Sequence, residues 1–381
     1  MDNTLITLKN ITKPVKLGGV GVYYKTLRAH LPEHVRYFHY TSEIGQNSIK
    51  LILSALKDIS LFATHCRKKK GGYKLVHLNP SLDSAGVVRD GIMLLVAKLH
   101  KKKTLVFFRG WHQKTEQRID NNRVIRWLFC KVYHQADAVV VLSSGFREKL
   151  LKWGFGQNIY IETTTFDATL LTQHNPIHRV TSDATINLLF MSRVERSKGI
   201  FNLLEAFEIL QQKRQDIRLN IAGVGRQLGE AKKFAATKGL NNVHFVGHVF
   251  GGKKAELLQN SDIFVFPTAH GEGMPNAVLE AMAFGLPVIT RPVGGLKDFF
   301  KEGEMGYLTD SLAPNTLADL IERLIMNKDT RQKMAAYNAA YAKQYFASDV
   351  VAERLLRIHH EVLNNITTDR TWFPGNAAAV L

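Results

Sequence analysis

The sequence predicts an α/β protein with two doubly wound domains, each built on a parallel β-sheet. Three observations support this fold class. Short apolar runs alternate with longer segments of helical periodicity, which is the pattern of repeated β-α-β units. The length of 381 residues exceeds what one ordinary hydrophobic core supports. The alternation also starts again near residue 184, after a polar, weakly patterned stretch at 172–183 that we interpret as an interdomain linker.

Residues 1–175 are predicted to form an N-terminal, Rossmann-like domain. Its strands are runs that are apolar on both faces, as expected for buried parallel strands. They are predicted at Leu5–Leu8, Val35–His39, Lys74–Leu78, Thr104–Phe108, Ala138–Leu142 and Ile159–Ile161. The helices predicted among them include one that begins near Val22 and the segments Ser48–Cys66, Gly86–Leu99 and Arg118–His134.

Residues 184–345 are predicted to form a second Rossmann-like domain with the same alternation. Its strands are predicted at Ile186–Met191, Ile217–Ala222, Val243–Val246, Ile263–Pro267 and Pro287–Thr290. Its first two helices are expected at about Gly199–Arg214 and Gln227–Lys238. The tail from Pro314 to Asn364 is predicted to be helical, with breaks near Asn327–Thr330 and Phe346–Ser348, and residues 346–381 are expected to cross back to the N-terminal domain.

Composition indicates a soluble globular protein, because 45% of the residues are hydrophobic and 22% are charged. The two cysteines, Cys66 and Cys130, lack metal-ligand spacing and are too few for a disulfide framework. The sequence shows no signal-peptide pattern, and no apolar run approaches the ~20 residues of a membrane span. We therefore expect a cytoplasmic protein that can associate peripherally with the inner face of a membrane.

The basic charge is concentrated in the first half of the chain. The net charge is +18, of which residues 1–175 carry +15 and the remainder +3. The clusters Arg67–Lys70 and Lys101–Lys103 each follow a predicted helix, and the helix dipole accounts for only one or two cations per cluster. Because no nucleic-acid-binding signature accompanies this charge, we expect no nucleic-acid partner and favour an anionic membrane surface with a lipid-phosphate acceptor. Charge that serves solubility alone is the simpler alternative.

The most informative motif joins two predicted buried strands through a loop and a helix at residues 271–289. Glu272 follows a strand directly, at the edge where open parallel sheets bind ligands. Pro275 suits the first helical turn, and Gly285 suits a helix C-terminus. Glu280 follows Glu272 by eight positions, inside the helix. Two carboxylates near a helix N-terminus can bind sugar and ribose hydroxyls while backbone N–H groups bind phosphate. A pair of solvated glutamates in an ordinary β-loop-α unit is the alternative.

This motif resembles the two glutamates, separated by seven residues, of retaining GT-B glycosyltransferases of the family 4, or group 1, type. The flanking residues E-G-x-P-N and E-A-M-A-x-G-x-P-V match as well, so the resemblance rests on about a dozen positions. It implies the GT-B fold, in which two Rossmann-like domains face a central cleft. The donor-binding residues that it implies are Gly18, Gly19, Gly223, Gly273, Met274, Pro275, Asn276 and Glu280.

Arg193 and Lys198 lie five positions apart where a predicted strand leads into a helix. A bidentate guanidinium and an ammonium suit a diphosphate leaving group. Cations at a helix N-terminus are unfavourable unless an anion binds there, which favours a functional interpretation over surface charge. The pair resembles the R-x4-K-G diphosphate site of the same family, with Ser192 in place of the usual glycine.

Glycine-rich turns and one loop complete the predicted site. Gly18 and Gly19 follow the first strand, where backbone N–H groups can approach phosphate, and Gly223 follows a strand of the second domain. Glycine-rich turns are common, so these signals are weak by themselves. Arg109 stands where relatives often carry a histidine that faces the donor sugar, and His112 follows three residues later. Either residue could contact substrate, and an ordinary loop histidine is an equal alternative for His112.

The resemblance implies that sugar passes from a nucleotide diphosphate, UDP rather than GDP, to a hydroxyl of a glycan or lipid-linked acceptor with retained anomeric configuration. Glu272, Arg193 and Lys198 would be catalytic, and Glu280 would bind the ribose. No Asp-x-Asp signature is present, so we expect neither a metal nor another cofactor. Cell-surface polysaccharide or lipopolysaccharide biosynthesis is the expected context.

Two other interpretations stay open. A sugar-nucleotide epimerase or a phosphorylase would keep the GT-B fold and change the chemistry. A non-enzymatic, basic polyanion-binding protein would explain the charge, and would bind polyanions without Glu272 and without preference for one nucleotide diphosphate. A Rossmann dehydrogenase is disfavoured, because no complete G-x-G-x-x-G follows the first strand.

Overall fold

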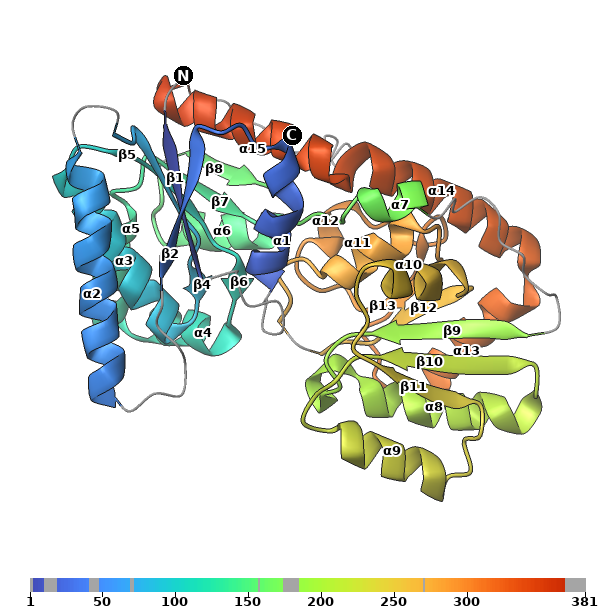
Figure 1. Ribbon diagram of the computed structural model, residues 1–381. Helices are drawn as coiled ribbons and strands as arrows, with labels where there is room; N and C mark the ends of the chain where they lie inside the picture. The colour runs from blue at the N-terminus through green and yellow to red at the C-terminus, as the bar shows by residue number, and fades with distance from the viewer. Residues whose placement is uncertain are drawn as a thin grey trace. The chain divides into compact units, whose positions relative to one another are not determined.

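A computed structural model describes residues 3–9, 19–40, 48–68, 72–156, 158–173, 185–269 and 271–366. The chain forms two compact units, each with its own parallel sheet (Figure 1). Unit 1 comprises residues 1–164, 271–274 and 349–381, and unit 2 comprises residues 165–270 and 275–348. The predicted fold class, α/β with two doubly wound parallel sheets, is confirmed. Gly18 and most of the predicted linker lie outside the described residues.

The sheet of unit 1 has the strand order β2-β1-β3-β5-β7-β8, and every neighbouring pair is parallel. Its strands are β1 (Thr4–Lys9), β2 (Val35–Tyr40), β3 (Leu75–Leu78), β5 (Lys103–Phe107), β7 (Ala138–Val141) and β8 (Asn158–Ile161). Strands β3, β5 and β7 lie in the interior of the sheet, and the side chains of β3 and β7 are buried throughout. Two-residue strands β4 (Ser81–Leu82) and β6 (Gly110–Trp111) pair separately.

Helices cover both faces of this sheet. In Figure 1, α2, α3 and α5 lie together on one side, and α1 lies on the other. The helices of unit 1 are α1 (Gly19–Leu27), the 3-10 turn η2 (Arg28–His30), α2 (Ser48–Arg67), α3 (Ser84–Leu99), α4 (Gln113–Asn121), α5 (Arg123–Tyr133), α6 (Ser144–Lys152) and α15 (Ser348–Leu363). The core packs Phe62, Leu94, Phe108 and Tyr133 against the apolar strand faces.

The single helix predicted at Arg118–His134 is wrong. The structure has two helices, α4 and α5, which meet at Asn122. Asn122 adopts an extended backbone, and its side-chain oxygen accepts hydrogen bonds from the N–H groups of Val124 and Ile125, both at 3.0 Å. In one continuous helix these two N–H groups would donate to backbone carbonyls of the preceding turn. Here the Asn122 side chain accepts their hydrogen bonds, so a new helix begins at Arg123.

The sheet of unit 2 has the order β11-β10-β9-β12-β13-β14, again all parallel. Its strands are β9 (Ile186–Met191), β10 (Ile217–Ala222), β11 (Val243–Gly247), β12 (Ile263–Phe266), β13 (Val288–Thr290) and β14 (Gly306–Leu308). Strand β12 is buried along its whole length. The strand order reverses between β9 and β12, because β9 leads to β10 and β11 on one side, and β12 leads to β13 and β14 on the other.

Helices α8 and α9 lie on one side of this sheet, and α10 and α11 lie on the other (Figure 1). The helices of unit 2 are α7 (Thr169–Gln173), the 3-10 turn η3 (Arg196–Lys198), α8 (Ile200–Lys213), α9 (Leu228–Thr237), α10 (Gly252–Gln259), α11 (Asn276–Ala283), α12 (Leu296–Phe299), α13 (Pro314–Met326) and α14 (Lys328–Phe346). The predicted breaks in the helical tail are confirmed at Asn327 and Ala347. Buried Asn338 of α14 donates to the carbonyls of Leu286 and Met305, both at 2.8 Å.

Candidate functional site

Two loops meet at the carboxyl edge of the unit 2 sheet, where the strand order reverses. One loop follows β9 and contains Arg193 and Lys198, and the other follows β12 and leads to α11. Strands β9 and β12 are hydrogen-bonded neighbours, and the N–H of Ala269 donates to the carbonyl of Ser197 at 2.8 Å. Open α/β sheets bind ligands at this position. The topology therefore brings the two loops singled out in the sequence to one edge of the sheet.

Arg193 and Lys198 occupy different environments in the first loop. The side chain of Arg193 is 59% exposed, and its Nη1 lies 2.7 Å from Oε1 of Glu195. Lys198 is only 5% exposed, and its Nζ lies 6.0 Å from the centre of the Phe266 ring. A buried ammonium interacts with an anion in a lower dielectric than water provides, so each contact with a diphosphate is stronger there. Exposed Arg193 can turn toward a ligand by giving up its contact with Glu195.

Two glycines allow backbone segments to approach closely around this loop. Gly199 has φ = +79°, and a Cβ atom there would lie 2.2 Å from the carbonyl oxygen of Pro267. Gly223 has φ = +150°, and a Cβ atom there would lie 1.8 Å from the carbonyl oxygen of Ser192. Both positions exclude other side chains, so Gly199 fixes the position at which buried Lys198 leads into α8.

Glu280 lies on the buried face of α11 and forms an ion pair that the sequence did not predict. Nζ of Lys254, on α10, donates to Oε1 of Glu280 at 2.6 Å, and the Glu280 side chain is 10% exposed. Lys254 stands next to Lys253 after two glycines, a pattern typical of a surface turn, so no sequence signal identified it. Pro275 is the residue before α11 rather than within its first turn, and Asn276 begins the helix.

Residues 271–274 pack in unit 1, so the chain passes from unit 1 to unit 2 between Met274 and Pro275. Met274 is buried, and Glu272 and Gly273 are partly buried. A Cβ atom at Gly273 would lie 2.6 Å from Cδ1 of Leu142 and 3.3 Å from the carbonyl oxygen of Arg109. A side chain here would force the end of Leu142 to move, so glycine favours the close packing of this loop.

Arg109, in the short link between β5 and β6, is a buried cation in unit 1. Its guanidinium carbon lies 3.7 Å from the centre of the Tyr23 ring and 4.2 Å from the centre of the Phe107 ring. Nε and Nη1 of Arg109 have no hydrogen-bond partner among the described residues. Burial raises the pKa of Tyr23 to about 12, and the neighbouring Arg109 cation opposes that rise. Buried donors without protein partners are suited to a bound anionic or hydroxyl group.

Two other residues of the predicted site, His112 and Gly19, lie where helices begin. His112 is the residue before α4, and its side chain makes no capping hydrogen bond to the helix. Gly19 is the first residue of α1 and has open space around its Cα. Among the described residues, no three His, Cys, Asp or Glu side chains are grouped so that they could hold a metal ion. No described helix is both long enough and apolar enough to span a bilayer.

Comparison with known proteins shows which family and which solved structures the chain is similar to. Residues 179–341 match the family described as glycosyl transferases group 1. The chain is similar to the capsular polysaccharide biosynthesis glycosyltransferase CapM of Staphylococcus aureus, with 23% identity over 338 residues that cover 83% of this chain and 86% of that protein. It is also similar to the phosphatidyl-myo-inositol mannosyltransferase of Mycobacterium leprae, with 29% identity over 176 residues. That match covers 46% of each chain, so it spans less than half the length of this relative.

Among solved structures, Anabaena Alr3699/HepE in complex with UDP and glucose superposes with a TM-score of 0.70. The match covers 94% of this chain and 100% of that chain at 16% identity. At this identity the likeness establishes the fold alone, and that fold is GT-B. The predicted resemblance and the predicted fold are thereby confirmed.

Proposed function

We propose that this protein, whose residues 179–341 match the glycosyl transferases group 1, transfers a sugar from a nucleotide diphosphate to a hydroxyl of a glycan or lipid-linked acceptor. The observation that carries the proposal is the joining of the β9 and β12 loops at the point where the strand order of unit 2 reverses. That edge holds buried Lys198, Arg193 and the N-terminus of α11. All three favour a diphosphate.

The proposed chemistry is electrostatic stabilisation of the leaving group. As the bond between the sugar and the diphosphate breaks, negative charge grows on the phosphate oxygens, and Lys198 and Arg193 neutralise it. Such preorganised charges contribute several kcal/mol to a transition state. Glu272 orients hydroxyls of the donor sugar, as the motif predicts, and the leaving phosphate accepts the acceptor proton on the same face, which retains the anomeric configuration. In this proposal the two cations take the place of a metal.

Glu280 is proposed to bind the ribose of the nucleotide, and Lys254 to position it. A carboxylate accepts hydrogen bonds from two adjacent hydroxyls, provided that its orientation is fixed. The ion pair of 2.6 Å with Lys254 fixes it while leaving the second carboxylate oxygen for the ligand. Lys254 is therefore a positioning residue rather than a catalytic one. Arg109, with two unused buried donors, is proposed to contact substrate in unit 1.

UDP is the proposed nucleotide, since the HepE structure contains UDP and glucose. The acceptor is proposed to be a cell-surface glycan or its lipid-linked precursor. CapM is named for capsular polysaccharide biosynthesis and the mycobacterial relative for a lipid acceptor, and the basic first half of this chain suits an anionic membrane surface.

The test is thermal stabilisation of the full chain by UDP, GDP, ADP and CMP in the presence of a chelator. A ligand at 100 times its Kd adds about 2.7 kcal/mol to the free energy of unfolding. We expect a shift with UDP that Arg193→Ala abolishes. Lys254→Ala should weaken UDP about tenfold, and Lys253→Ala, its exposed neighbour, should leave the affinity unchanged. Absence of any nucleotide response would overturn the proposal and favour a polyanion-binding protein.

A further inference from the structure

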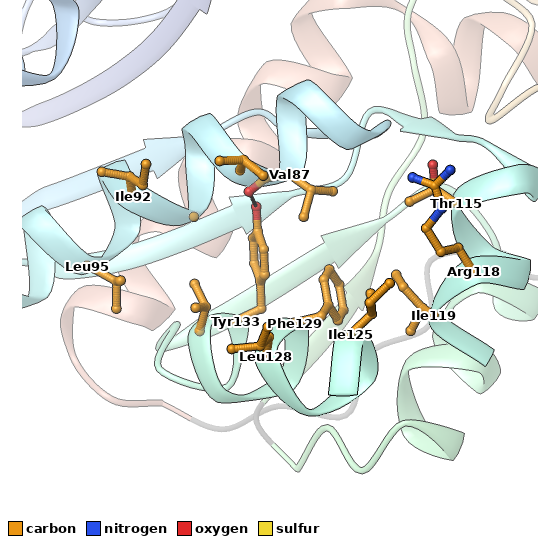
Figure 2. A pocket seen from close by; sticks show the side chains of 13 residues that line it. Val87, Ile92, Leu95, Thr115, Arg118, Ile119, Ile125, Leu128, Phe129 and Tyr133 are labelled. Carbon is orange, nitrogen blue, oxygen red and sulfur yellow. Dashed lines mark hydrogen bonds between the residues drawn. The ribbon is translucent and has the colours of Figure 1, made fainter. Parts of the chain in front are cut away.

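Helices α3, α4 and α5 of unit 1 enclose an apolar cavity that the proposed donor chemistry does not use. Its volume is about 370 Å³, within the range of roughly 300–1,000 Å³ for small-molecule sites. Figure 2 shows aliphatic side chains of α3 facing those of α5, with Arg118 and Thr115 of α4 at one end. Buried Phe129 and Tyr133 form part of its wall, and the Tyr133 hydroxyl donates to the carbonyl of Val87 at 2.8 Å.

Exposed apolar side chains extend this cavity onto the surface of unit 1. Val88 of α3 is 62% exposed and Leu128 of α5 is 51% exposed, although both line the cavity. On α5, Val124 and Trp127 are also exposed, and Val124 lies three residues before Trp127 and four before Leu128, so it neighbours both on the helix surface. Large exposed side chains gathered around an apolar cavity indicate a surface that is covered when the protein functions.

Basic side chains accompany the cavity, and we call them its basic rim. Arg118 lines one end, and α5, which forms one wall, also carries Arg123, Arg126 and Lys131 outside the lining itself. Nζ of Lys131 lies 4.7 Å from the centre of the Trp127 ring, so a cation and an amphipathic aromatic side chain occupy the same edge. Tryptophan with basic residues around an apolar face is typical of helices that lie in a membrane interface.

Acidic side chains of α4 do not cancel this charge, because they have partners elsewhere. Oε1 of Glu116 and Oδ2 of Asp120 lie 2.8 and 2.9 Å from Nζ of Lys149 on α6. The same two carboxylates accept hydrogen bonds from the indole N–H groups of Trp111 and Trp153. Lys149 offsets one of these two negative charges, and the four cations Arg118, Arg123, Arg126 and Lys131 outnumber the one that remains, so this surface of unit 1 stays positive.

We propose that this cavity binds an acyl chain of an anionic membrane lipid, with the headgroup held by the basic rim. A second copy of the chain is a poorer occupant, because a two-fold interface would bring the same positive rim against itself. This inference rests on the membrane association in the proposed function and makes it more specific, because it assigns one surface of unit 1 to the lipid. It does not depend on which nucleotide or sugar is the donor.

The experiment measures binding of the full chain to vesicles of phosphatidylglycerol and phosphatidylcholine whose acyl chains are brominated. Bromine quenches tryptophan that enters the hydrocarbon, so we expect quenching in the wild type and its loss in Trp127→Phe. Leu128→Asp should weaken vesicle binding at least tenfold. Leu151→Asp on α6, at a position 46% exposed and outside the cavity lining, is the matched control and should bind as the wild type does.

A separate variant tests the basic rim in the same experiment. Arg123→Gln should weaken binding to anionic vesicles about fivefold and reduce its salt dependence, since one basic residue near such a surface contributes about that factor. Pure phosphatidylcholine vesicles should bind weakly to wild type and variant alike. Equal binding of wild type and Leu128→Asp, or binding without quenching, would overturn the proposal. A dimer that Leu128→Asp dissociates would also overturn it, in favour of a second copy.

Nucleotide stabilisation of the same variants separates this inference from the proposed function. If Leu128→Asp retains UDP stabilisation but loses vesicle binding, the lipid surface is supported independently of the donor site. If the wild type binds vesicles with Trp127 quenched but responds to no nucleotide, the proposed function fails and the lipid site stands. If nucleotides stabilise the wild type and vesicles do not bind it, the lipid site alone fails.

Discussion

At the residue scale, the candidate site depends on its charged side chains. It depends equally on backbone positions where only glycine fits. Gly199 separates buried Lys198 from α8, and the carbonyl of Pro267 occupies the space that a Cβ atom would need. Because Pro267 follows β12, Gly199 also determines how closely the β9 and β12 loops can approach. The motif predicted a glycine after the lysine, but only the structure shows why it is required.

Gly199→Ala should therefore destabilise unit 2 and weaken UDP binding together. A left-handed φ of +79° and a contact of 2.2 Å with a backbone oxygen are expected to cost about 1–3 kcal/mol in the free energy of unfolding. The measurement is denaturant unfolding followed by circular dichroism, with the UDP affinity from calorimetry. Gly229→Ala in α9 is the control: nothing lies within 4 Å of its added Cβ, so it should stabilise by about 0.5–1 kcal/mol. Equal effects at both glycines would contradict the close-approach argument.

At the element scale, the long buried strands and the breaks in the helical tail were predictable, whereas the interruption between α4 and α5 was not. Buried parallel strands such as β7 and β12 are continuous apolar runs, so their composition identifies them. The boundary between α4 and α5 depends on one asparagine whose side chain caps a helix, and the apolar spacing continues across it. Two-residue strands such as β4 and β6 exist only because distant segments pair, which no local pattern predicts.

In the candidate site, too, some features could be predicted from the sequence and others could not. The alternation of elements predicts that Arg193 and Lys198 lie in a loop after a parallel strand, and the strand order that places this strand beside β12 comes from the structure. The partner of Glu280 could not be predicted, because Lys254 lies 26 residues away and reaches it only when α10 and α11 pack on the sheet. The catalytic and donor-binding roles of these residues stay predictions until variants are measured.

Asn122→Ala tests whether the cap is what separates α4 from α5. Its side-chain oxygen satisfies two backbone N–H groups, and loss of such a cap costs about 0.5–2 kcal/mol. Urea unfolding followed by tryptophan fluorescence measures this, because the described tryptophans all lie in unit 1. Asn121→Ala, at the exposed end of α4, should change the free energy of unfolding by less than about 0.5 kcal/mol. A similar loss at both positions would show that capping is not the cause.

At the scale of the whole molecule, unit 1 is assembled from distant parts of the sequence. Arg354 of α15 donates from Nε to both carboxylate oxygens of Glu162, at 2.9 and 3.1 Å, and both residues are buried. Nδ1 of His77 on β3 lies 2.9 Å from Nε2 of His359 on α15. Removal of either partner of the buried ion pair would leave a charge without compensation in the core. The C-terminal helix α15 is therefore part of the core of unit 1.

The histidine pair makes the stability of unit 1 depend on pH. Burial lowers the pKa of His359 to about 3 and lowers that of His77 well below its usual value. Both rings are therefore neutral in the folded state, whereas the unfolded chain binds protons below about pH 6.5. The free energy of unfolding should be unaffected by this pair above about pH 7. It should fall by up to about 1.4 kcal/mol per pH unit for each histidine as the pH drops from about 6.5 toward 3.

Replacement of one histidine should reduce the slope of the free energy of unfolding against pH. This slope distinguishes a lost titrating group from lost packing, because lost packing lowers stability equally at every pH. His359→Gln removes one titrating ring, so its free energy of unfolding should fall less steeply between pH 6.5 and 4.5 than that of the wild type, even if it is lower at pH 7.5. His244→Gln, at an exposed histidine of β11 in unit 2, should leave the slope for unit 1 unchanged. Tryptophan fluorescence follows unit 1 in each case. An equal slope in His359→Gln and wild type would show that carboxylates, rather than the buried pair, cause the acid sensitivity.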